Sequence, residues 1–207
     1  MHIARELRIH AVPVLELRPT QITVGIREVE AKRQSWREHP DRRKERFLGA
    51  HLIPVVRGPK DQLFVTDHHH LALALHREGV HDVATTVVAD LRKLPREAFF
   101  IYLDNRGWLH PYDEEGRRRT YEDLPRRVTG LVDDPYRSLA GELRLRGGFA
   151  KDTTPFSEFL WADFLRRRIK RKAVKRDFDA ALVAALELAK SADADYLPGW
   201  CGPSTRG

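Results

Sequence analysis

The stretch from Leu63 to Leu75 limits the possible folds of this chain more than any other part of it. An apolar run of β-type residues passes through a short polar turn into an apolar run of helix-forming residues. This pattern predicts a strand, a tight turn and a helix with three consecutive histidines in its first turn. A helix start leaves several backbone N–H groups without partners and carries about half a positive charge. The segment therefore predicts an anion-binding site, with phosphate as the obvious ligand.

A purely structural role for this turn is the competing interpretation. Asp67 is a good N-cap residue, and His68, His69 and His70 would then be polar surface residues. Successive helical side chains are about 100° apart, so the three imidazoles cannot all face one ligand, although their backbone amides can. One imidazole could still transfer a proton, because histidine titrates near neutral pH.

Composition favours a soluble globular protein with an anionic partner. Of 207 residues, 42% are hydrophobic and 32% are charged, and no apolar run approaches the roughly 20 residues that span a membrane. With no signal-peptide core at the N-terminus, we expect a cytoplasmic protein and no membrane partner. The single cysteine, Cys201, excludes a disulfide framework. A net charge of +7 favours a nucleotide or a nucleic acid as partner, and the oligomeric state stays open.

The periodicity predicts an α+β fold, with a small mixed β-sheet, helices packed on it and a mainly helical C-terminal part. We expect strands at residues 12–17, 52–56, 62–66 and 83–89, the middle two forming a hairpin, and a charged helix at residues 23–36. Asp134-Pro135 and Thr154-Pro155 predict further helix starts. We expect three units: a domain at 8–93, a helical extension at 94–190 and a mobile tail at 191–207.

Several residues could supply chemistry beside the histidine turn. Arg18 and Gln21, at the end of the first strand, could contact phosphate if that strand adjoins the turn. Glu28 and Glu30 lie on different faces of the first helix, so at most one of them faces the turn.

A divalent metal site, with Mg²⁺ or Mn²⁺, is an alternative hypothesis for the turn. Asp67 and His70 share a helix face at spacing i, i+3, and His51 or His110 could complete the ligand set. The sequence offers no His-Glu-x-x-His spacing in support, and it contains no Gly-x-Ser-x-Gly elbow for serine hydrolase chemistry.

The second half carries the densest basic run, which predicts a surface for nucleic-acid phosphates. A helix C-terminus also favours cations, so part of the run needs no partner. The candidate residues are Arg166, Arg167, Arg168, Lys170, Arg171 and Lys172.

Five segments together resemble the ParB-like nuclease family of bacteria. They are residues 17–21 (Leu-Arg-Pro-Thr-Gln), 51–56 (His-Leu-Ile-Pro-Val-Val), 67–70 (Asp-His-His-His), 133–141 and 155–163. The resemblance implies the ParB/sulfiredoxin fold, in which relatives hold nucleotide phosphates at the polar turn. This chain departs from the relatives, because its turn has no glycine, arginine or cysteine, and the missing cysteine argues against sulfiredoxin chemistry.

Three hypotheses follow for the function. The leading one is a phosphodiesterase or nuclease that binds a nucleotide or nucleic acid at residues 67–70. There Asp67 would hold a metal, His69 or His70 would transfer a proton, and Arg18 would neutralise the developing phosphoryl charge. The second is a nucleotide-dependent kinase of the same fold, in which the resemblance implies Glu28 or Glu30 as base. The third is a non-catalytic adaptor that binds nucleic acid through the basic run.

Overall fold

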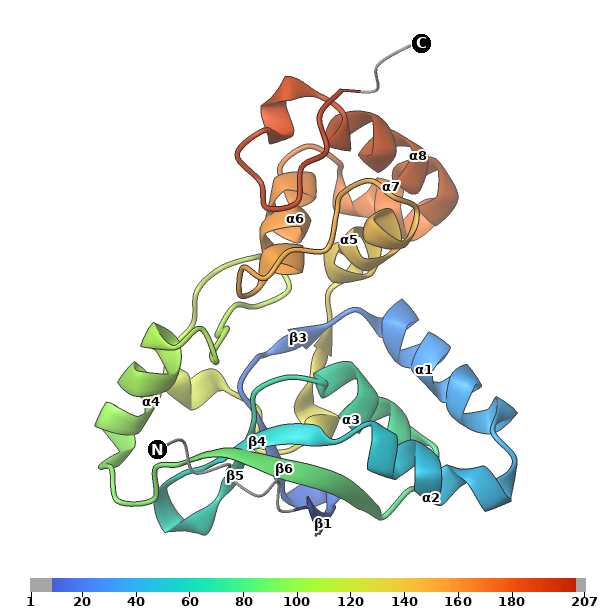
Figure 1. Cartoon of the computed structure of the whole chain (residues 1–207). Coiled ribbons are helices and arrows are strands. Elements are labelled where there is room, and N and C mark those ends of the chain that lie inside the picture. Colours follow the sequence, from blue (N-terminus) through green and yellow to red (C-terminus); the bar gives the residue numbers. More distant parts are fainter. Residues whose placement is uncertain (1–8, 204–207) are drawn as a thin grey trace, which may run out of the picture.

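A five-stranded mixed sheet forms the centre of the N-terminal part in the computed structural model, which describes residues 9–203 (Figure 1). Its strand order is β1-β6-β4-β5-β2, with β1 (Ile9–Pro13), β2 (Leu17–Pro19), β4 (Ile53–Arg57), β5 (Leu63–Val65) and β6 (Asp82–Asp90). Strands β4 and β6 are parallel, as are β2 and β5, whereas β1–β6 and β4–β5 are antiparallel. This arrangement confirms the expected α+β class and the hairpin.

The two faces of the sheet bury different cores. Val55 pairs with Val65, and both contribute to the core beneath α3 (His69–Arg77). Their neighbours Val56 and Phe64 pair on the opposite face, where they pack against α4 (Arg96–Asn105). Because strand side chains alternate between faces, one residue of shift decides which core a side chain joins.

Helices α1 (Ile26–Glu38) and α3 lie side by side, and α2 (Asp41–Ala50) follows α1 (Figure 1). The sequence prediction did not include α2. The structure also contains short 3₁₀ helices, η1 (Val14–Glu16), η2 (Pro59–Asp61), η3 (Tyr121–Asp123), η4 (Val128–Gly130) and η5 (Ala192–Ala194).

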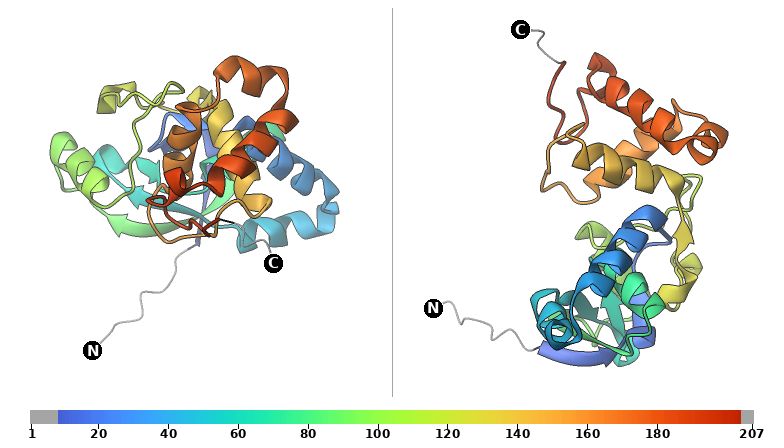
Figure 2. Two further views of the ribbon diagram at one scale, coloured as in Figure 1. Left: turned by 90° about the horizontal axis from the view of Figure 1, so that it is seen from above. Right: turned by 90° about the vertical axis from the view of Figure 1, so that its right-hand side faces the viewer.

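A two-stranded parallel ladder joins the N-terminal part to the helical part. It pairs β3 (Thr23–Val24) with β7 (Val132–Asp133) directly before α5 (Pro135–Leu145). Asp134 caps α5 by accepting a hydrogen bond from the Tyr136 amide, 3.0 Å away, which confirms the predicted helix start. Helices α5, α6 (Ser157–Arg166), α7 (Arg171–Arg176) and α8 (Phe178–Ala189) form a separate group at the far end from the sheet (Figure 2).

The division between cores differs from the expected boundary at residue 94. Phe99, Phe100 and Leu124 share a core with the strand residue Phe64, whereas the core of the helical part contains residues 136–197. Helix α4 and the segment around Leu124 therefore pack with the sheet, whereas His110 and Glu115 contact the helical part. Sequence could not reveal this, because an amphipathic helix does not specify which neighbouring surface covers its apolar face.

The segment expected as a mobile tail is packed in the structure as far as residue 203. Leu197 is buried, the Trp161 indole donates to the Pro198 carbonyl at 2.9 Å, and the Ala150 amide donates to the Gly199 carbonyl at 2.7 Å. Residues 204–207 lie outside the described residues.

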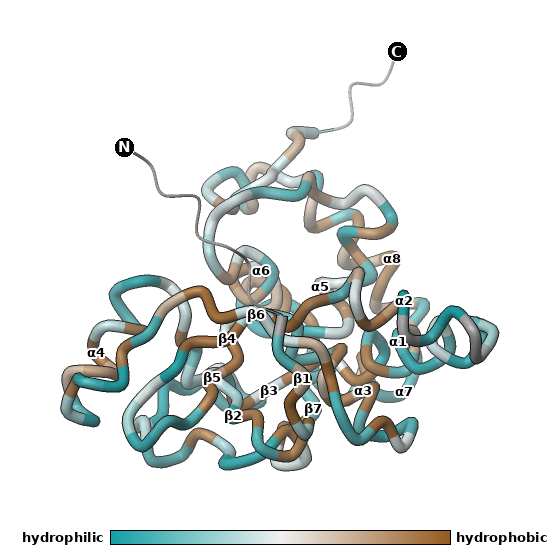
Figure 3. Tube along the Cα trace, turned by 60° about the horizontal axis from the view of Figure 1, so that its bottom comes forward, coloured by the Kyte–Doolittle hydropathy of each residue, from teal (hydrophilic) through white to brown (hydrophobic). Residues whose placement is uncertain are grey.

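Hydrophobic residues recur along the central strands and alternate with polar ones in the helices (Figure 3). Within residues 9–203, no helix combines the length and the apolar character needed to cross a membrane.

Candidate active site

A cavity of about 500 Å³ lies where the histidine turn faces the helical part. The N-terminal part contributes lining residues from the end of β2, the start of α1 and the start of α3, namely Gln21, Glu28, Thr66, Asp67, His69 and His70. The helical part contributes Arg137 of α5, Glu158 and Phe159 of α6, Arg144, and the loop residues Lys151 and Asp152. The two parts of the chain thus build this cavity together.

The backbone at the turn presents unpaired amides. His68, which adopts the left-handed conformation (φ 65°), is the N-cap of α3. Asp67 is therefore not the N-cap that the sequence suggested; its Oδ1 accepts a hydrogen bond from the His68 amide at 2.6 Å. The amides of His69, His70 and Leu71 donate to no acceptor within residues 9–203.

The buried ring of His69 makes hydrogen bonds with two backbone groups of the protein. Its Nε2 accepts a hydrogen bond from the Thr20 amide at 3.1 Å, and its ring also bonds the Val65 carbonyl. Burial lowers the pKa of His69 to about 3, an effect that outweighs attraction by Asp67. The ring is therefore neutral at physiological pH and ties the end of β2 to the start of α3.

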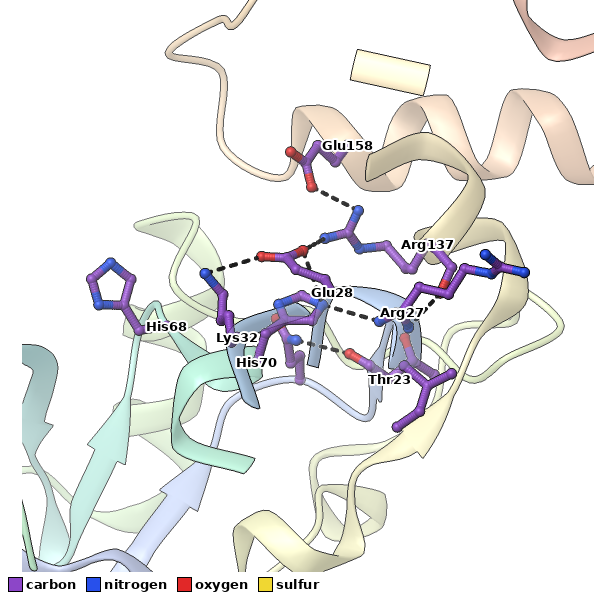
Figure 4. Close-up of polar contacts among 12 residues, drawn as sticks. Thr23, Arg27, Glu28, Lys32, His68, His70, Arg137 and Glu158 are labelled. Carbon is purple, nitrogen blue, oxygen red and sulfur yellow. Dashed lines mark hydrogen bonds and ion pairs between the residues drawn. The ribbon is translucent and has the colours of Figure 1, made fainter. Parts of the chain in front are cut away.

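His70 makes the equivalent link to α1. Its Nε2 accepts a hydrogen bond from the Gly25 amide at 3.0 Å and lies 3.4 Å from Oε2 of Glu28 (Figure 4). Burial lowers the pKa of His70 well below its ordinary value, and the charge of Arg137 lowers it further. Gly25 also allows the start of α1 to lie close to α5, because a Cβ there would be 2.8 Å from the Ser138 amide nitrogen.

Both imidazoles therefore position the turn through Nε2, in place of the proton transfer that the sequence suggested for them. The geometry also gives no metal-ligand set for Asp67 and His70, since Nε2 of His70 receives an amide proton. No three His, Cys, Asp or Glu side chains within residues 9–203 come together as a metal site. The described residues at the turn therefore do not fit an Mg²⁺ or Mn²⁺ site.

The other candidate ligands lie elsewhere. Nδ1 of His51 contacts the Phe47 carbonyl on α2, at 2.9 Å. His110 stacks on Phe159 with ring centroids 3.9 Å apart, and burial lowers its pKa to about 3. Exposed His68 does not line the cavity.

Glu28 faces the cavity and Glu30 does not. Oε2 of Glu28 lies 4.0 Å from Nη2 of Arg137, and Lys32 lies 3.6 Å from its other oxygen (Figure 4). Glu30 instead pairs with Arg33 and Arg77 on the outer side of α1. The structure thus distinguishes two carboxylates that the sequence left equivalent.

Arg137 is the residue that sequence reasoning missed. Its side chain is 4% exposed, pairs with Glu158 at 2.8 Å and lies over the Phe159 ring, 4.5 Å from the centroid. Its Nε is buried without a hydrogen-bond partner within the described residues. Arg144 also pairs with Glu158, at 2.6 Å. An arginine among the apolar residues of the stretch 135–143 was the available signal, because arginine is rarely buried without a specific role.

Gln21 and Arg18 lie on different sides of the sheet. Gln21 lines the cavity and donates to the Thr23 carbonyl at 2.8 Å. Arg18 pairs in register with Phe64 on the opposite face of the sheet, so it cannot face the histidine turn.

The basic run is largely neutralised within the protein. Arg166 pairs with buried Asp134 at 2.6 Å, and Arg171 pairs with Glu115 at 2.9 Å. Arg167 and Arg168 have carboxylate partners in Asp163 and Asp193. Only Lys170 and Lys172 of the six make no ion pair within residues 9–203, which weakens the case for a dedicated phosphate surface.

Comparison with known proteins shows a family and a solved structure to which this chain is similar. A family model described as "Putative ParB-like nuclease" matches residues 10–167. The crystal structure of protein Atu1540 from Agrobacterium tumefaciens is similar over 95% of this chain and 98% of its own, with 52% identity and a TM-score of 0.90. No curated protein matches the chain.

Proposed function

The chain belongs to the ParB-like nuclease family, and we propose that it binds the phosphate of a nucleotide or nucleic acid in the cavity at the start of α3. One observation carries the proposal: the unpaired amides that begin α3 border a cavity that also holds the buried guanidinium of Arg137. Helix amides attract anions, and arginine recognises phosphate oxygens.

Glu28 is the proposed general base. Its carboxylate lines the cavity beside the start of α3, within reach of a nucleophile attacking a bound phosphorus. It would accept the proton of that nucleophile as the new P–O bond forms and the bond to the leaving oxygen breaks. The α3 amides, Arg137 and Lys151 would stabilise the negative charge on the phosphoryl oxygens. With water as nucleophile, the reaction is phosphodiester hydrolysis.

Phosphotransfer is the second candidate, because the position of Glu28 serves it equally well. A hydroxyl of a small molecule would replace water, and a nucleoside triphosphate would supply the phosphoryl group. Incubation of ATP with the protein and candidate alcohols separates the two reactions, since transfer gives a phosphorylated alcohol and hydrolysis does not.

Binding is tested by isothermal titration with ATP, ADP, CTP and a short single-stranded oligonucleotide, with and without Mg²⁺. We expect saturable binding that Lys151→Ala weakens about tenfold, because a charge-assisted phosphate contact is lost. Lys172→Ala removes the same charge from α7, outside the cavity, and should bind like the wild type. Absence of binding to all four ligands, or an unchanged affinity in Lys151→Ala, would contradict the proposal.

Catalysis is tested by a second matched pair. Glu28→Gln should lower the rate of phosphoester cleavage or transfer at least about 100-fold while retaining ligand binding. Glu30→Gln makes the same chemical change on the outer side of α1 and should keep the wild-type rate. Equal rates for both variants would remove Glu28 from the mechanism.

A further inference from the structure

A second cavity, of about 390 Å³, lies on the α4 side of the sheet. Arg18 of β2, Arg96 of α4 and Arg126 line it, together with the side chains of Phe64, Phe100 and Tyr121. Lys60, Phe99 and the carboxylate of Glu122 also border this cavity, which we call the β2–α4 pocket. It shares no lining residue with the cavity at the start of α3.

Two of the three arginines of this pocket, Arg18 and Arg126, lack carboxylate partners within residues 9–203. The side chains of Arg18 and Arg126 make no hydrogen bond or ion pair within residues 9–203, and Arg96 forms one loose, mostly exposed pair with Glu122 at 3.9 Å. Arg18 is half-buried, whereas Arg96 and Arg126 are exposed. The other half-buried arginines of the described chain are paired, as Arg33 is with Glu78 and Arg166 with Asp134. The pocket therefore holds excess positive charge that the protein itself does not neutralise.

Burial and like charges both act against the charge of Arg18. Burial lowers the pKa of Arg18, and the charges of Arg126 and Arg96 lower it further. An arginine remains protonated at any working pH, so both effects act on a charged guanidinium. A bound anion would offset both effects, because it would pair with the guanidinium groups and screen their mutual repulsion.

The aromatic residues give the pocket a rigid wall. Phe100 stacks on Tyr121 with ring centroids 5.2 Å apart, and the Tyr121 hydroxyl donates to Asp104 at 3.1 Å. Phe64 contacts the rings of both Phe99 and Phe100, and Phe64 and Phe99 also line the pocket. A wall of this kind accommodates a planar, weakly polar group by stacking.

We propose that the β2–α4 pocket binds a nucleoside monophosphate, either as a free nucleotide or as the 5′-phosphorylated end of a nucleic-acid strand. The guanidinium groups of Arg18 and Arg126 hold the phosphate, and the base lies against the wall at Tyr121. The volume falls within the usual range for sites of small organic ligands. This inference does not depend on the function proposed for the other cavity.

The test is isothermal titration of the whole protein with AMP, adenosine, inorganic phosphate and a 5′-phosphorylated trinucleotide. We expect AMP or the trinucleotide to bind more tightly than adenosine or phosphate. Tighter binding of AMP indicates a free nucleotide as the ligand, and tighter binding of the trinucleotide indicates the 5′-phosphorylated end of a strand. Arg18→Gln and Arg126→Gln should each weaken this binding at least about tenfold. Arg176→Gln, an exposed control on α7, should not.

Two further measurements make the result decisive. Thermal unfolding should show Arg18→Gln at least as stable as the wild type, because the substitution removes an unpaired, repelled charge; a purely structural arginine would give a large decrease. Lys151→Ala, in the other cavity, should retain AMP binding here. Wild-type affinity in both arginine variants, no binding of AMP or trinucleotide by the wild type, or binding lost only in Lys151→Ala would each overturn the proposal.

Discussion

The three histidines at the turn have different roles despite their adjacency. His69 and His70 are buried and accept backbone amide hydrogens, whereas His68 is exposed and adopts a left-handed conformation. A sequence pattern cannot separate these roles, because the partners of the two rings, Thr20 and Gly25, lie 49 and 45 residues away. What the pattern did predict was the strand, the turn and the unpaired amides.

Replacing His69 by alanine should destabilise the protein by about 2–4 kcal/mol. The change leaves the buried Thr20 amide without an acceptor and creates a cavity. Urea unfolding measures the loss. His68→Asn, at an exposed position where asparagine tolerates the left-handed backbone, should change stability by less than about 0.5 kcal/mol. Similar effects for both variants would contradict the structural role of His69.

At the scale of elements, local patterns predicted the hairpin β4–β5, helix α3 and the capped start of α5. Helix α2 was missed because its residues 41–50 are mostly charged, with Phe47 and Leu48 as the only large apolar side chains. The candidate site was only half predictable. Its residues Arg137, Arg144 and Lys151 approach the histidine turn solely through the packing of α5 and α6, which periodicity does not specify.

The pair between Arg137 on α5 and Glu158 on α6 should be important for holding this half of the site. Glu158→Gln leaves the buried guanidinium without its closest counter-charge, and we expect a loss of roughly 3 kcal/mol of unfolding free energy. Glu142→Gln breaks an exposed pair with Arg146 on α5 and should cost less than about 0.5 kcal/mol. Chemical denaturation of both variants checks this, and a Glu158→Gln effect as small as that of Glu142→Gln would contradict it.

For the whole molecule, buried neutral histidines predict acid sensitivity. Burial lowers the pKa of His69 and of His110 to about 3 and that of His70 well below its ordinary value. Unfolded histidines take up protons near pH 6.5. Between about pH 6.5 and 3 the unfolded state therefore binds more protons than the folded state, so stability falls as the pH falls.

Below pH 6.5, the free energy of unfolding should fall by about 1.4 kcal/mol per pH unit for each histidine that is neutral in the folded state. Urea unfolding at pH 7.5, 6.5 and 5.5 measures it. His69→Gln should reduce this pH dependence of the free energy of unfolding by the contribution of one histidine, whereas His68→Asn should leave it unchanged. A free energy of unfolding that is unchanged between pH 7.5 and 5.5 would show that these rings are not held neutral.

The assembly of the site from two parts of the chain is the feature on which the proposed function depends. The sheet and α3 supply the amides, and α5 and α6 supply Arg137 and Glu158 around one cavity. The family match spans both parts, from residue 10 to 167. This agrees with a site that neither part forms alone.

The most direct test follows the backbone amides themselves, in ¹H–¹⁵N correlation spectra of the labelled protein during titration with ATP. The account predicts saturable shifts at the amides of His69, His70 and Leu71, together with smaller shifts at Lys151. If those three amides keep their positions while ATP binds elsewhere, or if no amide shifts at saturating ATP or oligonucleotide, the start of α3 is not the phosphate site.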